Sequence, residues 1–360
     1  MTSHKYPTHM RAAVLWKTGK PLSIEDNIQI PPLKPGQILI KILYSGVCRS
    51  QLMEVMGNRG TDKFLPHLLG HEGSGKVVEI GKGVSKVSRG DWVILGWIKA
   101  KGKNVPGAKY KLGRHCINSG PVTTFSTYTI VSENRVVLLP RNLPKDIAVL
   151  FGCALPTGAG IVFNEVKPKA GSSIAIVGLG GIGLSALMAT RFFQCKQVIA
   201  IDVSPKKLAL AKQFGATHLI NSSNTNVKQS IYKITNFQGV DYSIDAGGMT
   251  QTIEVAFDIL NANSGKCIFA SHPPQGQCIS LDPFHLISGK TIAGSWGGKS
   301  RPDKDIPMLA NLYLKGLLPL QTLFTKTYSL DQINLALDDL KNNNVFRPLI
   351  VMDENANENK

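Results

Sequence analysis

The chain has 360 residues, of which 43% are hydrophobic, so it is too long for one ordinary core and suits two folded domains. Its six cysteines include no Cys-x-x-Cys pair, which excludes a disulfide scaffold and predicts reduced thiols and a cytoplasmic location. A net charge of +17 raises the question of an anionic partner, although no recognised RNA or DNA motif accompanies the charge.

The first part of the chain, from residue 11 to 150, is rich in short β-like runs separated by Gly and Pro. The clearest runs begin at Gln37, Lys76 and Asp91. We therefore expect an all-β domain here. Ahead of it, residues 1–7 have no apolar run behind their positive charges, so we expect no secretory signal.

A strongly basic lobe follows the third of these runs. Six basic residues fall within sixteen positions that contain no acid: Lys99, Lys101, Lys103, Lys109, Lys111 and Arg114. A solvated basic surface is the simplest explanation of such a run. A polyanion or an anionic small substrate would also suit it.

From Ser172 onward, strands alternate with helical stretches, which is typical of βαβ units on a parallel sheet. Strands are expected at 174–177, 198–201, 242–245, 266–270 and 291–295, and a helix is expected from the glycine turn to Phe193. Helices near 306–315 and 330–341 and a strand at 348–351 follow, with a disordered polar tail from Asp353. The apolar stretch 171–190 has the length of a membrane span, but its glycines indicate a tight turn, and we expect no membrane partner.

The glycine turn itself fits the pattern G-x-G-x-x-G over Gly178-Leu-Gly-Gly-Ile-Gly183. It follows an expected strand and opens a helix, and Asp202 ends the next strand nineteen residues later, as a dinucleotide fingerprint requires. The expected cofactor-binding residues of the turn are Gly178, Gly180, Gly181, Ile182 and Gly183, where the helix N-terminus faces the phosphates. Asp202 can accept hydrogen bonds from the adenosine ribose and would repel a 2′-phosphate, which favours NAD. Its alternative role is to cap the helix that Ser204 and Pro205 open.

Several motifs occur in an order that resembles the zinc-dependent alcohol dehydrogenases of the medium-chain dehydrogenase/reductase superfamily. They are Gly46-Val-Cys-Arg-Ser50, Gly70-His-Glu-Gly73, Gly90-Asp91, Gly152-Cys153 with Thr157-Gly158, the glycine turn, and Arg347 before the last strand. The resemblance covers residues 11 to 352 and implies an α/β fold with two domains. A GroES-like β domain would span 1–154 and 298–360, and a Rossmann NAD-binding domain would span 155–297, with a cleft between them.

By this resemblance, Cys48, His71 and Cys153 are the ligands of a catalytic zinc. Two thiolates and one imidazole hold zinc with its fourth position open. Glu72 lies close enough to exchange onto the metal, and Ser50 matches the hydroxyl that touches the alcohol and passes its proton outward. Taken singly, each residue also has an ordinary structural role, such as a buried thiol or a turn hydroxyl.

The same resemblance assigns four more residues to the cofactor. Arg49 and Arg347 match positions that bind the pyrophosphate, a role suited to the guanidinium fork. Lys207 matches a side chain at the adenosine ribose, and Thr157 a residue beside the nicotinamide. The expected cofactors are NAD and one zinc per chain, and the expected assembly is a homodimer or a homotetramer.

Three positions depart from the family pattern. The lobe 97–116 has one cysteine where many relatives have four, so a four-thiolate structural zinc is impossible and the lobe must be held by packing or by a partner subunit. Gln51 replaces an aspartate near the metal, which predicts either a more electrophilic zinc or weaker metal retention. Met53 replaces a histidine that ends the proton relay in many relatives, which leaves the relay beyond Ser50 open.

Together these motifs predict reversible hydride transfer between an alcohol and NAD, giving an aldehyde or a ketone. If the basic lobe borders the cleft, the substrate is a polar or anionic alcohol, such as a sugar or polyol derivative; a simple primary alcohol is the alternative. One rival is a zinc-free quinone or enoyl reductase of the same superfamily, which lacks the Cys, His, Cys set. Another is a nucleic-acid binder on a dehydrogenase scaffold, suggested by the charge alone.

Overall fold

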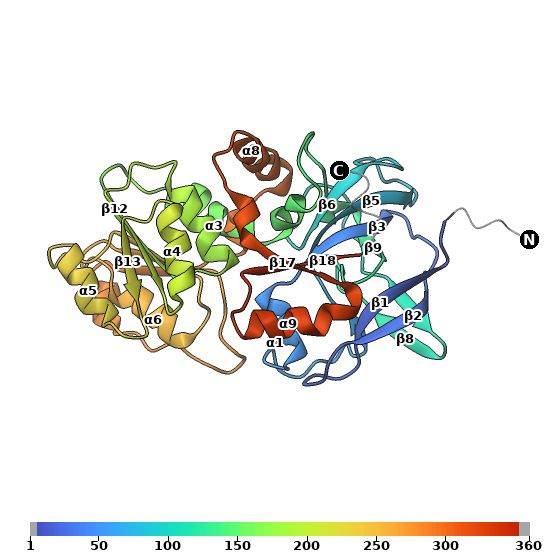
Figure 1. The fold of residues 1–360 in the computed structure, drawn as a ribbon, viewed down its shortest axis with the longest axis horizontal. Coiled ribbons are helices and arrows are strands. Elements are labelled where there is room, and N and C mark those ends of the chain that lie inside the picture. The colour runs from blue at the N-terminus through green and yellow to red at the C-terminus, as the bar shows by residue number, and fades with distance from the viewer. Residues whose placement is uncertain (1–5, 353–360) are drawn as a thin grey trace, which may run out of the picture. The chain divides into compact units, whose positions relative to one another are not determined.

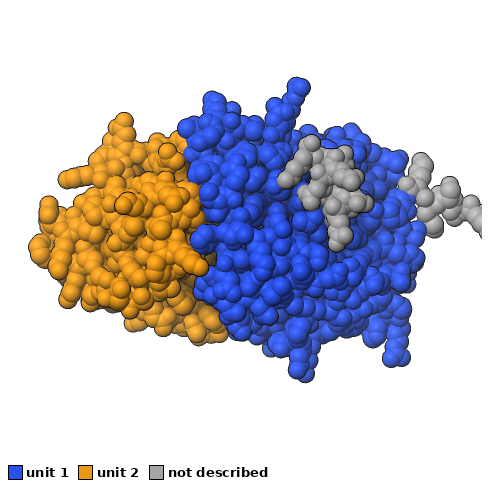
Figure 2. Space-filling view, viewed as in Figure 1, with its two compact units in different colours: residues 1–153, 301–360 blue, residues 154–300 orange. Residues whose placement is uncertain are grey.

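The computed structural model describes residues 6–352, which form two compact units (Figure 2). Unit 1 comprises residues 1–153 and 301–360, and unit 2 comprises residues 154–300. The division expected from the sequence places the first junction one residue later, after 154, and the second three residues earlier, after 297. The polar tail expected from Asp353 lies outside the described residues, as do the first five residues of the N-terminal segment.

Unit 1 is built mainly from strands, as the sequence predicted. They are β1 (His9–Leu15), β2 (Ser23–Gln29), β3 (Gln37–Gly46), β4 (His67–Leu68), β5 (Glu72–Ile80), β6 (Trp92–Gly96), β7 (Lys109–Leu112), β8 (His115–Asn118), β9 (Tyr128–Ser132), β10 (Val136–Leu138), β17 (Phe324–Ser329) and β18 (Arg347–Val351). A small closed barrel has the order β1-β2-β7-β8-β4. A second sheet has the order β10-β6-β5-β3-β18-β17, with β9 also paired to β3.

Strand β3 lies at the centre of the second sheet. Its sequence, QILIKILYSG, has five aliphatic residues, and the strand is buried almost throughout. It pairs with β5, β9 and β18, so the last strand of the chain completes a sheet that N-terminal strands begin (Figure 1). This pairing gives unit 1 its two separate stretches of sequence.

Unit 1 also contains helices. They are α1 (Arg49–Val55), α8 (Pro302–Leu314) and α9 (Ile333–Lys341). Helices α1 and α9 pack on one hydrophobic core, to which α1 contributes Leu52 and Val55 and α9 contributes Leu337 and Leu340 (Figure 1). This core fixes the helix that begins one residue after Cys48.

The basic lobe ends in the β7–β8 hairpin. Tyr110 and Ile117 point inward and are fully buried, while the six basic side chains of the lobe are exposed. The Tyr110 hydroxyl accepts a hydrogen bond from the backbone N–H of Ile130 at 2.8 Å, and burial raises the pKa of Tyr110 to about 12. The hairpin is therefore anchored by an aromatic side chain in the barrel core.

Glu133, in the short 3₁₀ helix η1 (Glu133–Arg135), fastens the stretch before the hairpin. Its carboxylate accepts hydrogen bonds from the backbone N–H groups of Ser85 at 2.6 Å, Lys86 at 2.8 Å and Lys103 at 2.9 Å. Burial alone would raise the pKa of Glu133, but these hydrogen bonds outweigh it and lower the pKa below its ordinary value. Packing and the carboxylates of Glu133 and Asp303, which accept from the N–H groups of Lys103 and Lys101, thus help to hold the lobe within this chain.

Unit 2 is a six-stranded sheet in which every neighbouring pair of strands is parallel. The strands are β11 (Ser173–Val177), β12 (Gln197–Asp202), β13 (His218–Asn221), β14 (Tyr242–Asp245), β15 (Lys266–Phe269) and β16 (Thr291–Gly294). Their spatial order is β13-β12-β11-β14-β15-β16. This is the 3-2-1-4-5-6 order of doubly wound dinucleotide-binding folds, which confirms the predicted parallel α/β sheet.

Helices alternate with these strands. They are α2 (Ala154–Gly160), which continues into the π-helix η3 (Ile161–Val166), α3 (Gly181–Thr190), α4 (Pro205–Gln213), α5 (Val227–Ile234), α6 (Thr250–Asp258) and α7 (Pro283–Ile287). Strand β11 is buried at every position, as expected for a central strand with helices on both faces. Ile231 of α5 and Phe257 of α6 pack with Ile199 and Ile201 of β12 in one core.

Two elements of unit 2 differ from expectation. Helix α3 ends at Thr190 rather than Phe193, because Phe192 and Phe193 leave the helix to pack their rings against Phe163. Strand β13 has no signal in the sequence pattern, since it has four residues and begins and ends with His218 and Asn221. Within residues 6–352, no helix has both the length and the apolar character needed to cross a membrane.

Candidate active site

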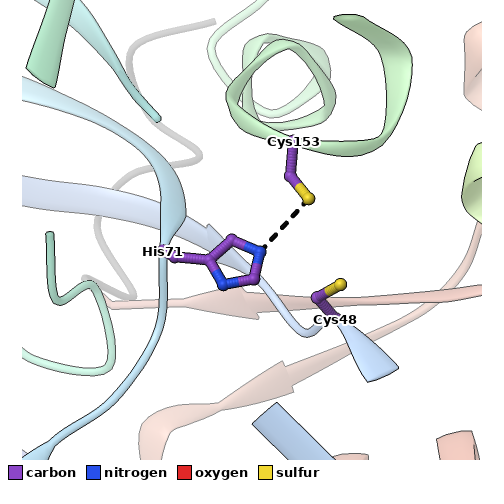
Figure 3. Close-up of side chains that lie close together, drawn as sticks. All are labelled: Cys48, His71 and Cys153. Atoms are coloured by element: carbon purple, nitrogen blue, oxygen red, sulfur yellow. Dashed lines mark hydrogen bonds between the residues drawn. The ribbon is translucent and has the colours of Figure 1, made fainter. Parts of the chain in front are cut away.

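Three potential metal ligands meet in unit 1 (Figure 3). Cys48 lies between β3 and α1, His71 directly precedes β5, and Cys153 follows the 3₁₀ helix η2 (Ile147–Gly152). One ligand atom from each lies within 4.8 Å of the other two. The Nε2 atom of His71 is 3.2 Å from the Sγ atom of Cys153. The structure thus brings together the three residues that the sequence predicted as zinc ligands.

The two thiols form a coupled pair. The pKa of Cys48 lies well below its ordinary value, because a hydrogen bond from Cys153 and the positive charge of Arg347 outweigh burial. The pKa of Cys153 lies well above its ordinary value, because it donates that hydrogen bond and is itself buried. The two thiols therefore share one negative charge readily. Loss of the second proton would place two negative charges side by side, which a bound cation would stabilise.

This donor set fits a zinc ion. Two sulfur atoms and one imidazole nitrogen are the donors of catalytic sites that keep one position open. Two residues after Cys48, on α1, the Oγ atom of Ser50 is buried and has no hydrogen-bond partner among residues 6–352. A buried hydroxyl without a partner costs about 1–3 kcal/mol, so a bound oxygen group that pairs with it would be stabilised.

Glu72, next to His71, is fully buried and closely packed. Its Oε2 atom pairs with the Nη2 atom of Arg347 at 2.5 Å, whereas its Oε1 atom has no partner. Burial raises the pKa of Glu72, and the charge of Arg347 opposes this rise. A Cβ atom at Gly46 would lie 2.4 Å from Oε1, and one at Gly152 would lie 2.8 Å from the Glu72 Cβ. Only glycine at these positions leaves room for the carboxylate.

Gln51 joins two of the three candidate ligands. Its side chain is buried, and its Oε1 atom accepts a hydrogen bond from the backbone N–H of Cys48 at 3.2 Å. Its Nε2 atom contacts the Nδ1 atom of His71. The amide that replaces the usual aspartate therefore still orients both Cys48 and His71.

The glycine turn of unit 2 has the geometry of a dinucleotide site. A Cβ atom at Gly178, where φ is +87°, would lie 2.6 Å from the backbone nitrogen of Gly247, and one at Gly183 would lie 1.9 Å from the carbonyl oxygen of Gly178. A Cβ atom at Gly180 would meet nothing within 4 Å. Gly181 and Ile182 form the first turn of α3. The open space at Gly180, beside a helix N-terminus, fits a pyrophosphate.

Asp202 ends β12 and accepts hydrogen bonds from two neighbouring segments, the glycine turn and the residues just before α4. Its Oδ2 atom accepts from the N–H of Leu179, in the glycine turn, at 2.7 Å. Its Oδ1 atom accepts from the N–H of Ser204 at 2.9 Å. Ser204 precedes α4, so this bond does not satisfy an N–H of the helix, as the alternative capping role would require. The Nζ atom of Lys207 lies 3.9 Å from Oδ2. Each carboxylate oxygen keeps acceptor capacity for a ribose hydroxyl.

The remaining predicted cofactor residues are divided between the units. Thr157 is buried in α2 of unit 2. Arg49 is exposed at the start of α1 in unit 1. Arg347 is buried on Glu72, and the charge of Glu72 outweighs burial and raises the pKa of Arg347 above its ordinary value. The structure therefore shows Arg347 as the counter-ion of Glu72, and its contact with a pyrophosphate stays a prediction.

Comparison with known proteins decides the family. The alcohol dehydrogenase GroES-like domain matches residues 34–141, and the zinc-binding dehydrogenase domain matches residues 181–314. An S-(hydroxymethyl)glutathione dehydrogenase of Escherichia coli O1:K1 is 32% identical over 371 residues, covering 94% of this chain and 99% of that protein. The chain belongs to the zinc-dependent alcohol dehydrogenase family. The predicted combination of a GroES-like β domain and a Rossmann domain is thereby confirmed.

Solved structures of zinc-dependent alcohol dehydrogenases agree with this assignment. A zinc-binding-domain alcohol dehydrogenase from Burkholderia ambifaria has a TM-score of 0.88 at 30% identity, covering 96% of this chain and 99% of that one. Benzyl alcohol dehydrogenase from Acinetobacter calcoaceticus has a TM-score of 0.87 at 30% identity, covering 96% of this chain and 100% of that one. The protein is therefore a dehydrogenase that acts in alcohol oxidoreduction.

Two polar features of this dehydrogenase were missed by sequence reasoning. The hydroxyls of Ser45 and Thr124 both donate to the carbonyl oxygen of Glu72, at 3.2 and 3.1 Å, and so brace the strand beside His71. A second group of potential metal ligands, Glu54, Asp62 and His67, also lies close together. His67 is hydrogen-bonded to Asp62 at 2.7 Å, and Arg59 lies 3.5 Å from Glu54, so polar contacts within the chain explain this group without a metal.

Proposed function

We propose that this dehydrogenase couples interconversion of an alcohol and its aldehyde or ketone to NAD, using one zinc ion per chain held by Cys48, His71 and Cys153. The observation that carries the proposal is the Cys48, His71, Cys153 cluster, together with the buried Ser50 hydroxyl two residues after Cys48, for which the described residues offer no hydrogen-bond partner. A zinc ion in such a donor set supplies Lewis-acid polarisation of a substrate oxygen.

The chain's own residues then have separate tasks. Ser50 Oγ accepts the substrate's hydroxyl proton, and Glu72, with one oxygen unpaired, is available to the metal. Arg49 and Arg347 bind the pyrophosphate together with the turn from Gly178 to Gly183. Asp202 and Lys207 hold the adenosine ribose, and Thr157 packs beside the nicotinamide. Because Met53 offers no base, the proton would leave Ser50 by a ribose hydroxyl and water, or by another base.

A screen of alcohols and aldehydes, followed by NADH absorbance with and without a chelator, tests the reaction. We expect turnover that a chelator abolishes and zinc restores, and metal analysis that finds one zinc per chain. Cys153→Ser should lose both zinc and turnover, whereas Cys116→Ser, at an exposed cysteine, should lose neither. Turnover that survives complete zinc removal would instead favour a zinc-free quinone or enoyl reductase.

Cofactor preference tests Asp202 separately. Asp202→Ser should lower the NAD-to-NADP ratio of kcat/KM by about tenfold to a hundredfold, because a charge-assisted hydrogen bond is lost and repulsion of a 2′-phosphate is relieved. If Asp202 only caps α4, the variant would be less stable but would keep the parent's ratio.

For the substrate we propose a polar or anionic alcohol, such as a sugar or polyol derivative. The six exposed basic side chains of the lobe support it, as does the similarity to S-(hydroxymethyl)glutathione dehydrogenase. The similarity to benzyl alcohol dehydrogenase favours a simpler, apolar alcohol. An anionic substrate should show a KM that rises with ionic strength, whereas benzyl alcohol should not. A gel-shift with a steep salt slope would point to nucleic acid.

We also propose a homodimer or homotetramer. Strand β16 lies at the edge of the unit 2 sheet, and large apolar side chains near it in sequence are exposed, including Ile287 at 83% and Trp296 at 80%. Exposed apolar surface of this kind is typical of subunit interfaces. Light scattering of the purified protein distinguishes monomer, dimer and tetramer. The cytoplasmic location expected from the cysteine pattern stays a prediction.

A further inference from the structure

Glu165, in the π-helix η3 of unit 2, is a buried acid that none of the tasks proposed above uses. Its side chain is 3% exposed. Its Oε1 atom accepts a hydrogen bond from the Oγ atom of Ser295, and its Oε2 atom lies 3.6 Å from the Nζ atom of Lys299. Both partners belong to the segment 295–299, which directly follows β16. One carboxylate therefore holds both ends of this segment.

Ser295 links this acid to the backbone of the short 3₁₀ helix η4 (Gly297–Lys299). The N–H of Gly298 donates to Ser295 Oγ at 3.0 Å. Because that N–H only donates and a carboxylate only accepts, the hydroxyl of Ser295 accepts from Gly298 and gives its own proton to the bond with Glu165. The partners themselves thus fix the direction of both hydrogen bonds.

Gly298 lies against Thr157, the residue that we place beside the nicotinamide. Its φ is +65°, and a Cβ atom on it would lie 2.4 Å from the carbonyl oxygen of Thr157, so only glycine fits here. The side-chain amide of Asn164 donates to the Gly298 carbonyl at 3.0 Å, and Ser300 Oγ donates to the carbonyl of Pro156 at 2.5 Å. The segment after β16 is therefore fastened to α2 and η3 within unit 2.

This segment also lies at the ligand-binding edge of the parallel sheet. Ser295 follows the carboxyl end of β16, as Gly178 follows the carboxyl end of β11. In folds with this strand order a dinucleotide lies across the carboxyl ends of the strands, and each half of the sheet takes one nucleotide. Asp202, on β12, belongs to the half that we assign to the adenosine. Strands β14 to β16 then belong to the half that takes the nicotinamide nucleotide.

We propose that Glu165 is a positioning residue for the nicotinamide end of the cofactor. Through Ser295 it holds Gly298 against Thr157 before NAD arrives, so binding does not have to order this segment. Loss of the acid should weaken the hold on the nicotinamide and leave the hold on the adenosine unchanged. The inference rests on the proposed NAD site and deepens it, because it adds an acid that acts through other residues.

Calorimetric titration of the purified full chain with NADH and with ADP-ribose tests this division. ADP-ribose contains the adenosine, the pyrophosphate and the second ribose but no nicotinamide. Glu165→Ala should bind NADH about tenfold more weakly, as expected for loss of one charge-assisted hydrogen bond, and ADP-ribose within about twofold of the native chain. Glu254→Ala is the matched control. It removes a unit 2 carboxylate that accepts from the N–H of Ser280 at 2.8 Å, and it should bind both ligands as the native chain does.

Ser295→Ala gives a second readout, because it removes the link and keeps the acid. It should weaken NADH about as much as Glu165→Ala does, and the double variant should weaken it no further. Glu165→Gln keeps an acceptor oxygen for Ser295 and should bind NADH within about threefold of the native chain. Additive losses in the double variant would contradict the link through Ser295.

These results separate the inference from the proposed function. If the native chain binds NADH and Glu165→Ala binds it equally well, the inference fails and the NAD site stands. Equal losses for NADH and ADP-ribose would give Glu165 a structural task alone and would also overturn the inference. If the native chain binds neither ligand, the NAD site is wrong and both fail.

Discussion

Two buried glutamates of unit 1 differ in whether both of their carboxylate oxygens have hydrogen-bond or ion-pair partners. Glu133 is 2% exposed, accepts from three backbone N–H groups with its two oxygens, and has a lowered pKa. Glu72 is fully buried, pairs through one oxygen with Arg347, and leaves the other oxygen without a partner. Burial raises its pKa.

The difference shows that burial alone does not mark a functional carboxylate. Both oxygens of Glu133 accept from backbone N–H groups, and these bonds join loops that are distant in sequence, which is a structural task. Glu72 keeps an unpaired oxygen beside the candidate ligand cluster, so it can take another donor or cation at little cost. Unsatisfied hydrogen-bonding capacity, rather than depth, distinguishes the two.

The largest expected effect concerns the ion pair of Glu72. Arg347→Met should lower the free energy of unfolding by about 3–5 kcal/mol, because it leaves a fully buried carboxylate without its cation. The double variant, Glu72→Gln with Arg347→Met, should lose less than the sum of the two single variants. Denaturant titration of all four proteins measures this, and strictly additive losses would show that the pair is not coupled.

Removal of the Glu133 carboxylate should have the next largest effect. Glu133→Ala leaves the backbone N–H groups of Ser85, Lys86 and Lys103 without this acceptor and should lower the free energy of unfolding by about 2–4 kcal/mol. Asp26→Asn, at an exposed carboxylate paired with Arg11, is the control and should change it by less than about 0.5 kcal/mol. Similar losses from both variants in denaturant titration would remove the structural role given to Glu133.

A smaller effect is expected from Glu133→Gln, which should lower the free energy of unfolding by about 1–2 kcal/mol at neutral pH and by less in acid. Because the pKa of Glu133 is lowered on folding, its contribution is complete above the unfolded pKa and is lost as pH falls through the folded pKa. The native chain should therefore lose more stability across this acidic window than the variant does. Unfolding free energies at several pH values test this, and parallel curves would contradict it.

The smallest effect is expected from Tyr110→Phe. The variant keeps the buried ring but removes the acceptor of the Ile130 N–H, so it should cost about 1 kcal/mol. Tyr313→Phe is the matched control, because its hydroxyl accepts from Gln321 at an exposed position. If the two tyrosine variants unfold at the same denaturant concentration, the hydroxyl of Tyr110 does not help to anchor the lobe.

The sequence predicted the parts of the site that depend on short motifs. The strand, turn and helix around Gly178 to Gly183 are local features, and so are the residues that flank Cys48 and His71. The contacts of Gln51 with His71 and of Glu133 with Ser85 join residues 20 and 48 positions apart. Such contacts leave no periodicity in the sequence, so only the folded chain reveals them. The same applies to Gly46, whose missing side chain makes room for Glu72.

The position of β18 has a consequence for the order in which the protein is synthesised. Cys48, His71, Glu72 and Cys153 all leave the ribosome before any of unit 2, whereas Arg347 belongs to the last strand, which pairs with β3. The nascent chain therefore carries a complete ligand cluster for more than half of its translation before the cation that neutralises Glu72 is made. A product that stops before residue 347 has every candidate zinc ligand but lacks the guanidinium that pairs with Glu72.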